Sequence, residues 1–546
     1  MDELWYKDAI FYAVDVESFQ DGNGDGTGDF QGLTSRLDYL SDLGVNCLWL
    51  LPFYTTPNRD NGYDVKDYYS IDARLGSLQD FSDFVAAARE RKIRILIDLI
   101  VHHTSDEHPW FQAGSTDPTS KFHAFYVWRE ERPAKEEAEN VFPGEENSVW
   151  SYEKRAGAFY HHQFYSFEPD LNVANPEVQK EILSLIEFWL SFGIDGFRVD
   201  AATHLLDGKG RPGTRLRRPA AFLKSLRKAV TKKSKATILL AEADVTPDKV
   251  GFYYGKGDRI NMLFNFLLDN YMFLALARED AAPITGFLEK PAPPERCQWT
   301  NFLRNLDELD LERLSEEERE DVFERFAPEE NMRIFNRGIR RRMAPMLDGN
   351  RSYMEMVYSL LFTMPGSPLL VYGDEIGMGD DLEQPGRTSV RNPMQWNSCT
   401  GGGFSDAPPG KLFRRLITSG PFSIKKVNVE AQLHEENSFL NWMKRLIMIR
   451  KNSSEIGWGQ PQVVQSDQPH VLVHSYDWEG NVLVFAHNLS AKPCQFSISS
   501  RKFHPRQFVD IFCDKDYAPT TEHTTQVALE GYGYRWFRVN ELKTKQ

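Results

Sequence analysis

Short apolar runs alternate with longer amphipathic stretches from Ile10 onward, and this alternation constrains the fold more than any other feature of the sequence. β-rich runs separated by helical patterns, such as Phe81–Arg91 and Val178–Phe192, are typical of repeated βα units around a parallel sheet. Eight parallel strands close most simply into a (β/α)8 TIM barrel, and a doubly wound open sheet is the alternative. The eight predicted strands are Ile10–Val16, Val45–Leu51, Arg94–Val101, Asp195–Val199, Thr237–Ala241, Met262–Phe266, Trp299–Leu303 and Pro368–Tyr372.

Two segments depart from this alternation and divide the chain. Residues 104–170 are rich in Pro, Gly, Glu and aromatic residues without clear periodicity, and they are too long for an ordinary loop. We therefore predict an inserted domain after the third strand. Beyond about Gly459, short alternating runs predict a C-terminal antiparallel β-domain. The predicted domains are 1–103 and 171–458 for the barrel, 104–170 for the insertion and 459–546 for the β-domain.

The charge-dense run Asp307–Arg325 is predicted to be the solvated face of a helix. Across the whole chain of 546 residues, the net charge of −15 would repel a nucleic-acid backbone or an anionic bilayer. The sequence also offers no secretory leader and no apolar run long enough to cross a membrane. Five scattered cysteines without a CxxC pair favour reduced thiols, so we expect a soluble cytoplasmic protein.

Carboxylates recur where the predicted strands end. Asp98 lies near the end of the third strand, Asp200 closes the fourth, Glu242 closes the fifth and Asp307 follows the seventh. A single acid at such a place is more often a helix cap or an ion-pair partner. Because the carboxyl ends of barrel strands meet at one mouth, four such acids together favour a catalytic site.

Three acids around one pocket suit the cleavage of glycosidic bonds. One can attack the anomeric carbon, one can protonate the leaving oxygen, and one can stabilise the positive sugar ring of the transition state. Arg198 lies two residues before Asp200 on the same predicted strand, so it shares that face and can hold the carboxylate ionised. This chemistry needs no organic cofactor.

The sequence resembles the α-amylase superfamily, that is, family 13 glycoside hydrolases, over nearly its whole length. The four motifs that carry the resemblance are Asp98–His103, Gly196–Asp200, Ala241-Glu242 and Phe302–Asp307. The resemblance implies that Asp200 is the nucleophile, Glu242 the general acid/base and Asp307 the transition-state stabiliser. It also implies a C-terminal domain of the β-sandwich type.

Further motifs resemble particular subgroups. The resemblance implies that Tyr63, Asp64, His103, Arg198 and Arg391 bind the sugar. Glu168-Pro-Asp-Leu-Asn172 is similar to a motif of α-glucosidases, oligo-1,6-glucosidases and trehalose synthases, in which the first residue is usually Gln. The stretches 338–342, 372–379 and 427–432 look most like trehalose synthases, which interconvert maltose and trehalose. We therefore expect a retaining enzyme acting on a small α-glucoside through a glucosyl-Asp200 intermediate.

An acidic glycine-rich loop predicts a structural Ca²⁺ site. Asp21, Asn23, Asp25, Thr27 (through its carbonyl) and Asp29 place oxygen ligands at alternate residues, as in the first half of an EF-hand loop. Gly32 stands where an EF-hand would place its bidentate Glu, so the pattern favours an isolated loop site. A solvated turn without a metal is the alternative.

Several positions depart from the family pattern. His102 stands where the family usually has an Asn that helps bind a second Ca²⁺ ion, so a second site is in doubt. Leu306 stands where the family has a His that hydrogen-bonds the sugar. Losing about 2–3 kcal/mol of transition-state stabilisation with that hydrogen bond would slow turnover roughly 30- to 150-fold. Thr203-His204, which follows the strand of the predicted nucleophile, makes the acceptor-side contacts unlike those of trehalose synthases. The choice of acceptor is therefore left open. Two alternatives remain: a hydrolase of the oligo-1,6-glucosidase type, and a non-catalytic protein that binds sugar or a protein partner.

Overall fold

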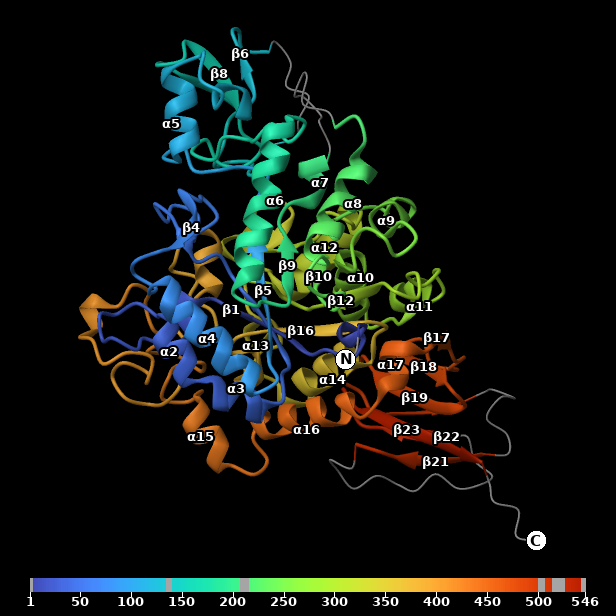
Figure 1. Cartoon of the computed structure of the whole chain (residues 1–546). Coiled ribbons are helices and arrows are strands. Elements are labelled where there is room, and N and C mark those ends of the chain that lie inside the picture. The colour runs from blue at the N-terminus through green and yellow to red at the C-terminus, as the bar shows by residue number, and fades with distance from the viewer. Residues whose placement is uncertain (1–2, 134–139, 207–215, 499–505, 513–525, 542–546) are drawn as a thin grey trace.

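The computed structural model describes residues 3–133, 140–206, 216–498, 506–512 and 526–541. Within them, a central barrel carries a segment inserted beyond one end and a separate β-domain on another side (Figure 1). No helix among these residues is both long and apolar enough to cross a bilayer.

Eight parallel strands form a closed barrel, which confirms the predicted fold class. Each predicted strand contains or overlaps one observed strand. Their side chains are almost completely buried on both faces, as expected for strands that are covered by helices outside and packed inside. In chain order the barrel strands are β1 (Phe11–Val14), β2 (Cys47–Leu50), β5 (Arg94–Leu99), β9 (Gly196–Val199), β10 (Ile238–Ala241), β11 (Met262–Phe264), β12 (Gln298–Asn301) and β16 (Ser367–Val371).

Helices cover the outside of the barrel. The helix α4 (Leu78–Glu90) begins with a capping box in which Ser77 and Asp80 each bond the other's backbone amide, and it buries Phe81 and Phe84. The other long helices of this layer are α6 (Pro176–Ser191), α8 (Pro219–Val230), α9 (Pro247–Tyr254), α10 (Phe266–Arg278), α11 (Ala282–Leu288), α14 (Arg351–Thr363) and α16 (Phe439–Lys451).

The segment between β5 and β9 contains its own small fold. It holds the helix α5 (Pro109–Thr116) and a three-stranded sheet in the order β6 (Trp128–Arg129), β8 (Ala158–His161), β7 (Trp150–Glu153). Stacked aromatic rings, such as Phe111 against Trp128 at 5.5 Å, stabilise this sheet. The short strands explain why no clear periodicity marks this part of the sequence.

The C-terminal β-domain consists of two antiparallel sheets with a shared apolar core. The hairpin between β18 (Val471–Trp478) and β19 (Asn481–Asn488) turns through Glu479 and Gly480, both with positive φ, as a tight two-residue turn requires. The larger sheet adds β17 (Gln460–Val463), β23 (Tyr534–Glu541) and β21 (Arg506–Asp510), and the smaller pairs β20 (Cys494–Ser497) with β22 (Gln526–Leu529).

One expectation about secondary structure is wrong. Residues Asp307–Arg325 do not form one helix, because β13 (Leu309–Asp310) and a turn occupy their first part. The helix α12 (Glu316–Phe326) begins only after Ser315, whose side chain accepts from the amide of Glu318. Asp307, at the start of this run, therefore lies in the loop between β12 and β13.

Candidate active site

The register of three neighbouring strands brings the predicted acids together. Asp98 on β5 lies beside Arg198 on β9, and Val199 on β9 lies beside Ala241 on β10. The next residues along β9 and β10 are Asp200 and Glu242. Both therefore emerge at the same level at the carboxyl end of the barrel.

Arg198 connects three carboxylates through one buried guanidinium. Its Nη1 lies 2.6 Å from Asp98 Oδ1 and 2.5 Å from Asp200 Oδ1, and its Nη2 lies 2.9 Å from Glu242 Oε1. The side chain also packs over the ring of Trp49, which donates an indole N–H to Asp98 at 3.0 Å. Three acids around one cation carry an excess of negative charge, which favours protonation of at least one of them.

The surroundings of the acids shift their pKa values in different directions. Burial raises the pKa of Glu242 to about 7 and the charges of Asp200 and Asp307 add to the effect, although Arg198 opposes it. Burial also raises the pKa of Asp200, against the pull of Arg198. For Asp307 burial again acts upward, but Arg387 and Arg391 outweigh it, so the pKa of this carboxyl is lowered. At neutral pH, Asp307 is ionised while Glu242 is partly protonated.

Asp307 is held by two arginines from the loop that follows β16. Arg391 Nη2 lies 2.6 Å from Asp307 Oδ1, and Arg387 Nη1 lies 3.4 Å from the same atom. Arg391 also donates from Nε to the carbonyl of Leu306 at 2.8 Å. The side chain of Leu306 is buried and apolar, so this position contributes a backbone acceptor and no side-chain hydrogen bond.

Three further residues predicted to bind the sugar are Tyr63, His103 and Asp64, and each has its own set of contacts. The ring centroid of Tyr63 lies 5.8 Å from the Arg198 guanidinium, and the Tyr63 carbonyl lies 3.2 Å from His103 Nε2. Burial lowers the pKa of His103 to about 4, so this imidazole is neutral. The carboxylate of Asp64 accepts hydrogen bonds from its own loop, including the Thr56 hydroxyl at 2.8 Å and the Arg59 amide at 3.1 Å.

Asp60 is an additional acid at this site that the sequence reasoning missed. Burial raises its pKa to about 6, the charges of Arg387 and Arg391 oppose this shift, and the charge of Asp307 adds to it. Asp60 therefore lies within electrostatic range of the arginine pair that holds Asp307. The motif Asp60-Asn-Gly-Tyr-Asp64 offers two acids, and only the fold reveals which of them lies within range of the arginines.

Glu168 behaves as a neutral side chain. It is fully buried, with Oε1 3.8 Å from His103 Nε2 and Oε2 accepting from the Tyr165 amide at 3.3 Å. Burial, followed by the charges of Asp60 and Asp64, raises its pKa well above the ordinary value. A protonated Glu has nearly the shape of Gln, which is the residue expected from the family pattern.

The acids Glu242 and Asp307 line a cleft of ≈ 600 Å³. Its outer wall comes from two segments that meet over it. The rings of Phe142, from the inserted segment, and Phe335, from a turn between β14 (Arg333–Ile334) and β15 (Gly338–Ile339), lie 4.9 Å apart. Arg337 bonds the carbonyl of Val141 at 3.0 Å, and the Arg387 guanidinium covers the Phe142 ring at 4.9 Å. The cleft is thus partly roofed.

His102 belongs to a buried group between the barrel and the inserted segment. Its Nδ1 lies 3.4 Å from Asp170 Oδ1, and His161 Nδ1 lies 2.7 Å from Asp170 Oδ2. Imidazoles therefore surround the carboxylate at the place where the sequence comparison left a second Ca²⁺ site in doubt. Within the described part of the chain, no cluster of three or more His, Cys, Asp or Glu side chains is arranged to hold a metal.

The predicted calcium loop forms a compact turn in which side-chain oxygens accept from backbone amides. Asp21 accepts from the amides of Gly24 at 2.7 Å and Gly26 at 2.8 Å, and Asp29 accepts from Gly32 at 2.6 Å. Asp21 and Asp29 also converge on a shared donor, the amide of Asn23, each at 3.1 Å. The donor set is all oxygen, the ligand type that Ca²⁺ prefers, but Asp21, Asp25 and Asp29 do not form a three-acid metal cluster in this conformation.

The remaining loop acid is Asp25, which is exposed and accepts from the Thr27 amide at 2.8 Å. Gly26 has φ +102°, and an added Cβ would collide with the carbonyl of Lys411. The loop can therefore follow its present course only with glycine at this position.

Comparisons with known proteins identify the family of this chain. The family described as "Alpha amylase, catalytic domain" matches residues 14–459. The chain belongs to the α-amylase family. A second family, "Sucrose hydrolase-like, C-terminal domain", matches residues 480–538.

Relatives of this α-amylase-family chain extend over almost its full length. A trehalose synthase of Pimelobacter sp. (strain R48) is 40% identical and covers 99% of this chain and 96% of that protein. An oligo-1,6-glucosidase of Parageobacillus thermoglucosidasius is 29% identical, covering 91% of this chain and 92% of its own length. The predicted resemblance to trehalose synthases is thereby confirmed, and the oligo-1,6-glucosidases are more distant.

Solved structures show the same fold. An α-amylase from H. orenii superposes with a TM-score of 0.78 at 25% identity, covering 97% of this chain and 99% of that one. A Bacillus licheniformis trehalose-6-phosphate hydrolase gives a TM-score of 0.79 at 23% identity, over 98% of this chain and 100% of that one. The family match and the trehalose synthase relatives show that the chain is an α-amylase-family enzyme of the glycosidase and glucosyltransferase class.

Proposed function

We propose that this enzyme interconverts maltose and trehalose through a glucosyl group bound to Asp200. One observation carries the proposal: the Arg198 guanidinium holds two carboxyl groups, that of Asp200 beside Nη1 and that of Glu242 beside Nη2. Asp200 and Glu242 are thereby held next to each other on one cation, as the nucleophile and the acid of a retaining enzyme must be. The relatives named trehalose synthase support the choice of substrates.

In the first step, ionised Asp200 attacks the anomeric carbon of the bound glucosyl unit. The glycosidic C–O bond breaks, and Glu242 gives its proton to the leaving oxygen, so free glucose forms beside the glucosyl-enzyme. Asp307, held ionised by Arg387 and Arg391, stabilises the positive charge of the sugar ring in the transition state.

In the second step, the released glucose turns and offers its anomeric hydroxyl to the intermediate. Glu242 takes up the proton of that hydroxyl, the new glycosidic bond forms and the ester bond to Asp200 breaks. Each displacement inverts the anomeric centre, so the two together retain its configuration. They join the glucose units through both anomeric carbons, which is the linkage of trehalose. The reaction neither consumes water nor needs an organic cofactor.

Transfer requires that water be kept from the intermediate. The contacts of Phe142, Phe335 and Arg337 over the cleft support this requirement, because they connect the inserted segment to the barrel above the acids. A hydrolase of short α-glucosides is the second candidate, favoured by the relatedness to oligo-1,6-glucosidases. A non-catalytic sugar- or protein-binding role is the third interpretation, and it predicts no turnover of any α-glucoside.

Trapping the intermediate tests the proposal. α-Glucosyl fluoride can form the ester without an acid, whereas the variant Glu242→Gln lacks the base needed to release it. We expect mass spectrometry of this variant to find one glucosyl unit on the peptide that contains Asp200. The double variant Glu242→Gln/Asp200→Asn, as the control, should carry none. Persistence of the adduct in the double variant would remove Asp200 from its proposed role.

We also propose that the loop formed by Asp21, Asn23, Asp25, Thr27 and Asp29 binds a structural Ca²⁺ ion. The support is its all-oxygen donor set and the convergence of Asp21 and Asp29. When bound, the ion would stabilise the conformation of the loop that precedes α2 (Phe30–Ser35). It has no role in the chemical steps.

Thermal unfolding in Ca²⁺ and in EGTA tests this proposal. A ligand at about one hundred times its Kd adds about 2.7 kcal/mol of stability, so for a chain of this length we expect a Tm about 2–3 °C higher in Ca²⁺. Asp25→Ala should abolish the difference, since it removes an exposed ligand that holds no other element. Identical Tm values for the unsubstituted chain in Ca²⁺ and in EGTA would refute the site.

We propose a cytoplasmic location, supported by free thiols at Cys47, Cys297, Cys399 and Cys494. We propose a small α-glucoside as the partner that this enzyme binds, rather than a nucleic acid or a membrane surface. Fractionation of cells that express the native protein tests the location, and recovery from the medium would contradict it.

A further inference from the structure

The loop that carries Asp307 is held through its main chain as well as through its carboxylate. Arg391 donates from Nε to the carbonyl before Asp307, and Arg304 donates from Nη2 to the carbonyl of Asp307 itself, both at 2.8 Å. Further along, the side-chain amide of Asn270 donates to the carbonyl of Asp310 at 2.7 Å. Three side chains thereby fix peptide groups on the stretch that follows β12.

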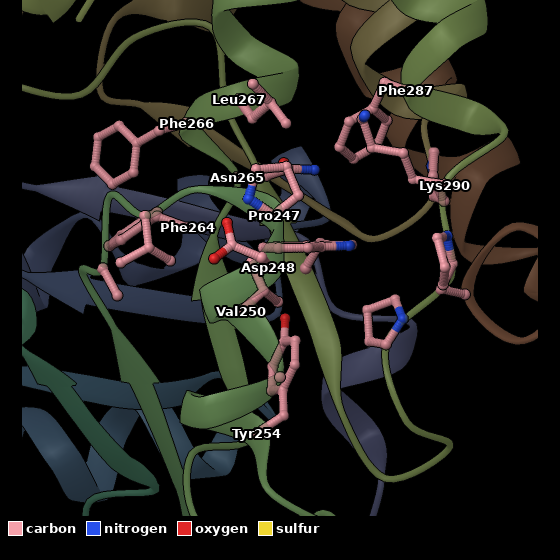
Figure 2. A pocket seen from close by; sticks show the side chains of 18 of the residues that line it. Pro247, Asp248, Val250, Tyr254, Phe264, Asn265, Phe266, Leu267, Phe287 and Lys290 are labelled. Atoms are coloured by element: carbon pink, nitrogen blue, oxygen red, sulfur yellow. The ribbon is translucent and has the colours of Figure 1, made fainter. Parts of the chain in front are cut away.

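Asn270 lies on α10, which is itself anchored to the barrel. The N-cap residue of this helix, Asn265, donates from its side-chain amide to Asn301 Oδ1 at 2.8 Å. Asn301 is the last residue of β12, the strand that leads to Asp307. Figure 2 shows Asn265 and Phe266 at the start of α10, beside a cavity of ≈ 490 Å³ that both residues line. The helix and the strand therefore form one frame around the loop.

Arg304 is a buried cation with few partners. The residue is only 3% exposed, and its Nε and Nη1 have no hydrogen-bond partner among the described residues. Burial lowers the pKa of Arg304 to about 10, so the guanidinium is still charged at neutral pH. The charges of Asp269, Glu308 and Asp374 act on it, but none of these carboxylates forms an ion pair with it.

The first of these acids is a weak counter-charge. Burial raises the pKa of Asp269 well above its ordinary value, although the charge of Arg304 opposes the shift. A buried cation without an ionised partner in contact costs folding free energy, and one hydrogen bond offsets little of that cost. Folding stability alone therefore does not explain an arginine at position 304, and its one hydrogen bond indicates a role in the catalytic loop.

We propose that Arg304 is a positioning residue for Asp307. Its hydrogen bond fixes the peptide group of Asp307, and so the direction from which the carboxylate meets the sugar ring. The charge of Arg304 also acts on Asp307 in the direction that favours the ionised carboxylate. The inference rests on the proposed role of Asp307 in the transition state, and it adds the residue that orients this carboxylate without touching the substrate.

The buried guanidinium of Arg450 offers a matched control. It is also buried, it donates from Nη2 to the carbonyl of Gly366 at 3.0 Å, and its Nε and Nη1 have no hydrogen-bond partner among the described residues. Its ion pair with Asp8 is long, at 4.0 Å. Arg450 lies on α16 and does not line the catalytic cleft. Methionine at either position removes a buried charge and one hydrogen bond to a carbonyl, but only Arg304 holds the carbonyl of a catalytic residue.

Steady-state release of fluoride from α-glucosyl fluoride tests the proposal, with thermal unfolding to show that each variant is folded. We expect Arg304→Met to lower kcat about 10- to 100-fold with KM nearly unchanged, because Asp307 acts in the transition state. Arg304→Lys restores a cation and a donor, so its kcat should lie between those of Arg304→Met and the unsubstituted chain. Arg450→Met should keep the kcat of the unsubstituted chain.

The proposal is overturned if Arg304→Met keeps the original kcat, if its loss lies in KM alone, or if Arg450→Met loses as much. If Arg304→Met does not fold, Arg304→Lys decides, because its kcat should still fall with KM unchanged. Fluoride release is common to a transferase and a hydrolase. A chain that releases fluoride but forms no trehalose from maltose would therefore contradict the proposed interconversion and leave the role of Arg304 standing, whereas no fluoride release by the unsubstituted chain would overturn both.

Discussion

At the scale of single residues, the candidate site depends on how one arginine divides its hydrogen bonds. Arg198 serves Asp98, Asp200 and Glu242, while Asp307 is left to Arg387 and Arg391. Asp307 has two positive neighbours, one of which, Arg387, also pairs with Glu308 at 2.7 Å, whereas Glu242 shares one with two other acids. This difference explains why the pKa shifts of Asp307 and Glu242 have opposite signs.

The raised pKa of Glu242 predicts the alkaline limb of the pH profile. The first step needs Glu242 protonated, so kcat/KM should fall as the pH rises through about 7. Initial rates with maltose between pH 5 and about 9 measure this limb. A profile that stays flat from about pH 6 to 9 would contradict the assignment of Glu242 as the acid.

A control separates loss of the acid from loss of the site. Glu242→Gln keeps the shape of the side chain and its contact with Arg198, but it cannot donate the proton. We expect about a 10²- to 10⁴-fold loss with maltose. The loss should be much smaller in the formation of the ester from α-glucosyl fluoride, because fluoride leaves without protonation.

At the scale of structural elements, the turn between β14 and β15 is the feature most directly linked to transfer. Phe335 and Asn336 are consecutive non-glycine residues with φ of 54° and 59°. Such strain is uncommon and is often found at functional sites. Here it places Phe335 against Phe142 and aligns Arg337 with the Val141 carbonyl across the cleft.

Removing the Phe335 ring should open this roof. We expect Phe335→Ala to increase the fraction of glucose among the products of maltose, because water gains access to the intermediate. Phe413→Ala is a suitable control, since Phe413 is 43% exposed and does not line the cleft. Product analysis by chromatography measures the ratio, and an unchanged ratio in Phe335→Ala would show that this contact does not exclude water.

The elements that sequence patterns predicted best are those with a strong local signal. Barrel strands such as β5 and β9 are continuous buried runs, and the helix α6 has one apolar face, so both are visible in the sequence. Because the strand ends are visible in the sequence, the acids at those ends were predicted to lie close together. The start of α12 was missed because its boundary depends on the Ser315 cap inside a uniformly charged run.

The features that escaped prediction depend on long-range contacts. Asp60 and Asp64 belong to one loop, and only folding brings Asp60 within electrostatic range of the arginines from the loop after β16. The roof over the cleft likewise joins Val141 to Arg337, which are 196 residues apart. No local pattern encodes such pairs, so the enclosure of the site could not be derived from the sequence.

At the scale of the whole molecule, the β-domain is joined to the barrel through α14. Trp536 donates its indole N–H to Ser359 at 2.8 Å, and Ser359 is also 3.0 Å from His487 Nε2. Tyr476 donates to the carbonyl of Thr363 at 2.8 Å, at the end of the same helix. The helix leads into β16, so the β-domain supports the strand that precedes the loop carrying Arg387 and Arg391.

The partition between transfer and hydrolysis is a property of the whole assembly of barrel, inserted segment and loops. Measuring this partition tests the central claim most directly. A proton NMR time course of the purified protein with maltose, in the presence of Ca²⁺, follows trehalose and free glucose through their anomeric signals. The account predicts that trehalose forms faster than glucose and that trehalose is converted back to maltose. Glucose accumulating without trehalose would contradict it and identify a hydrolase.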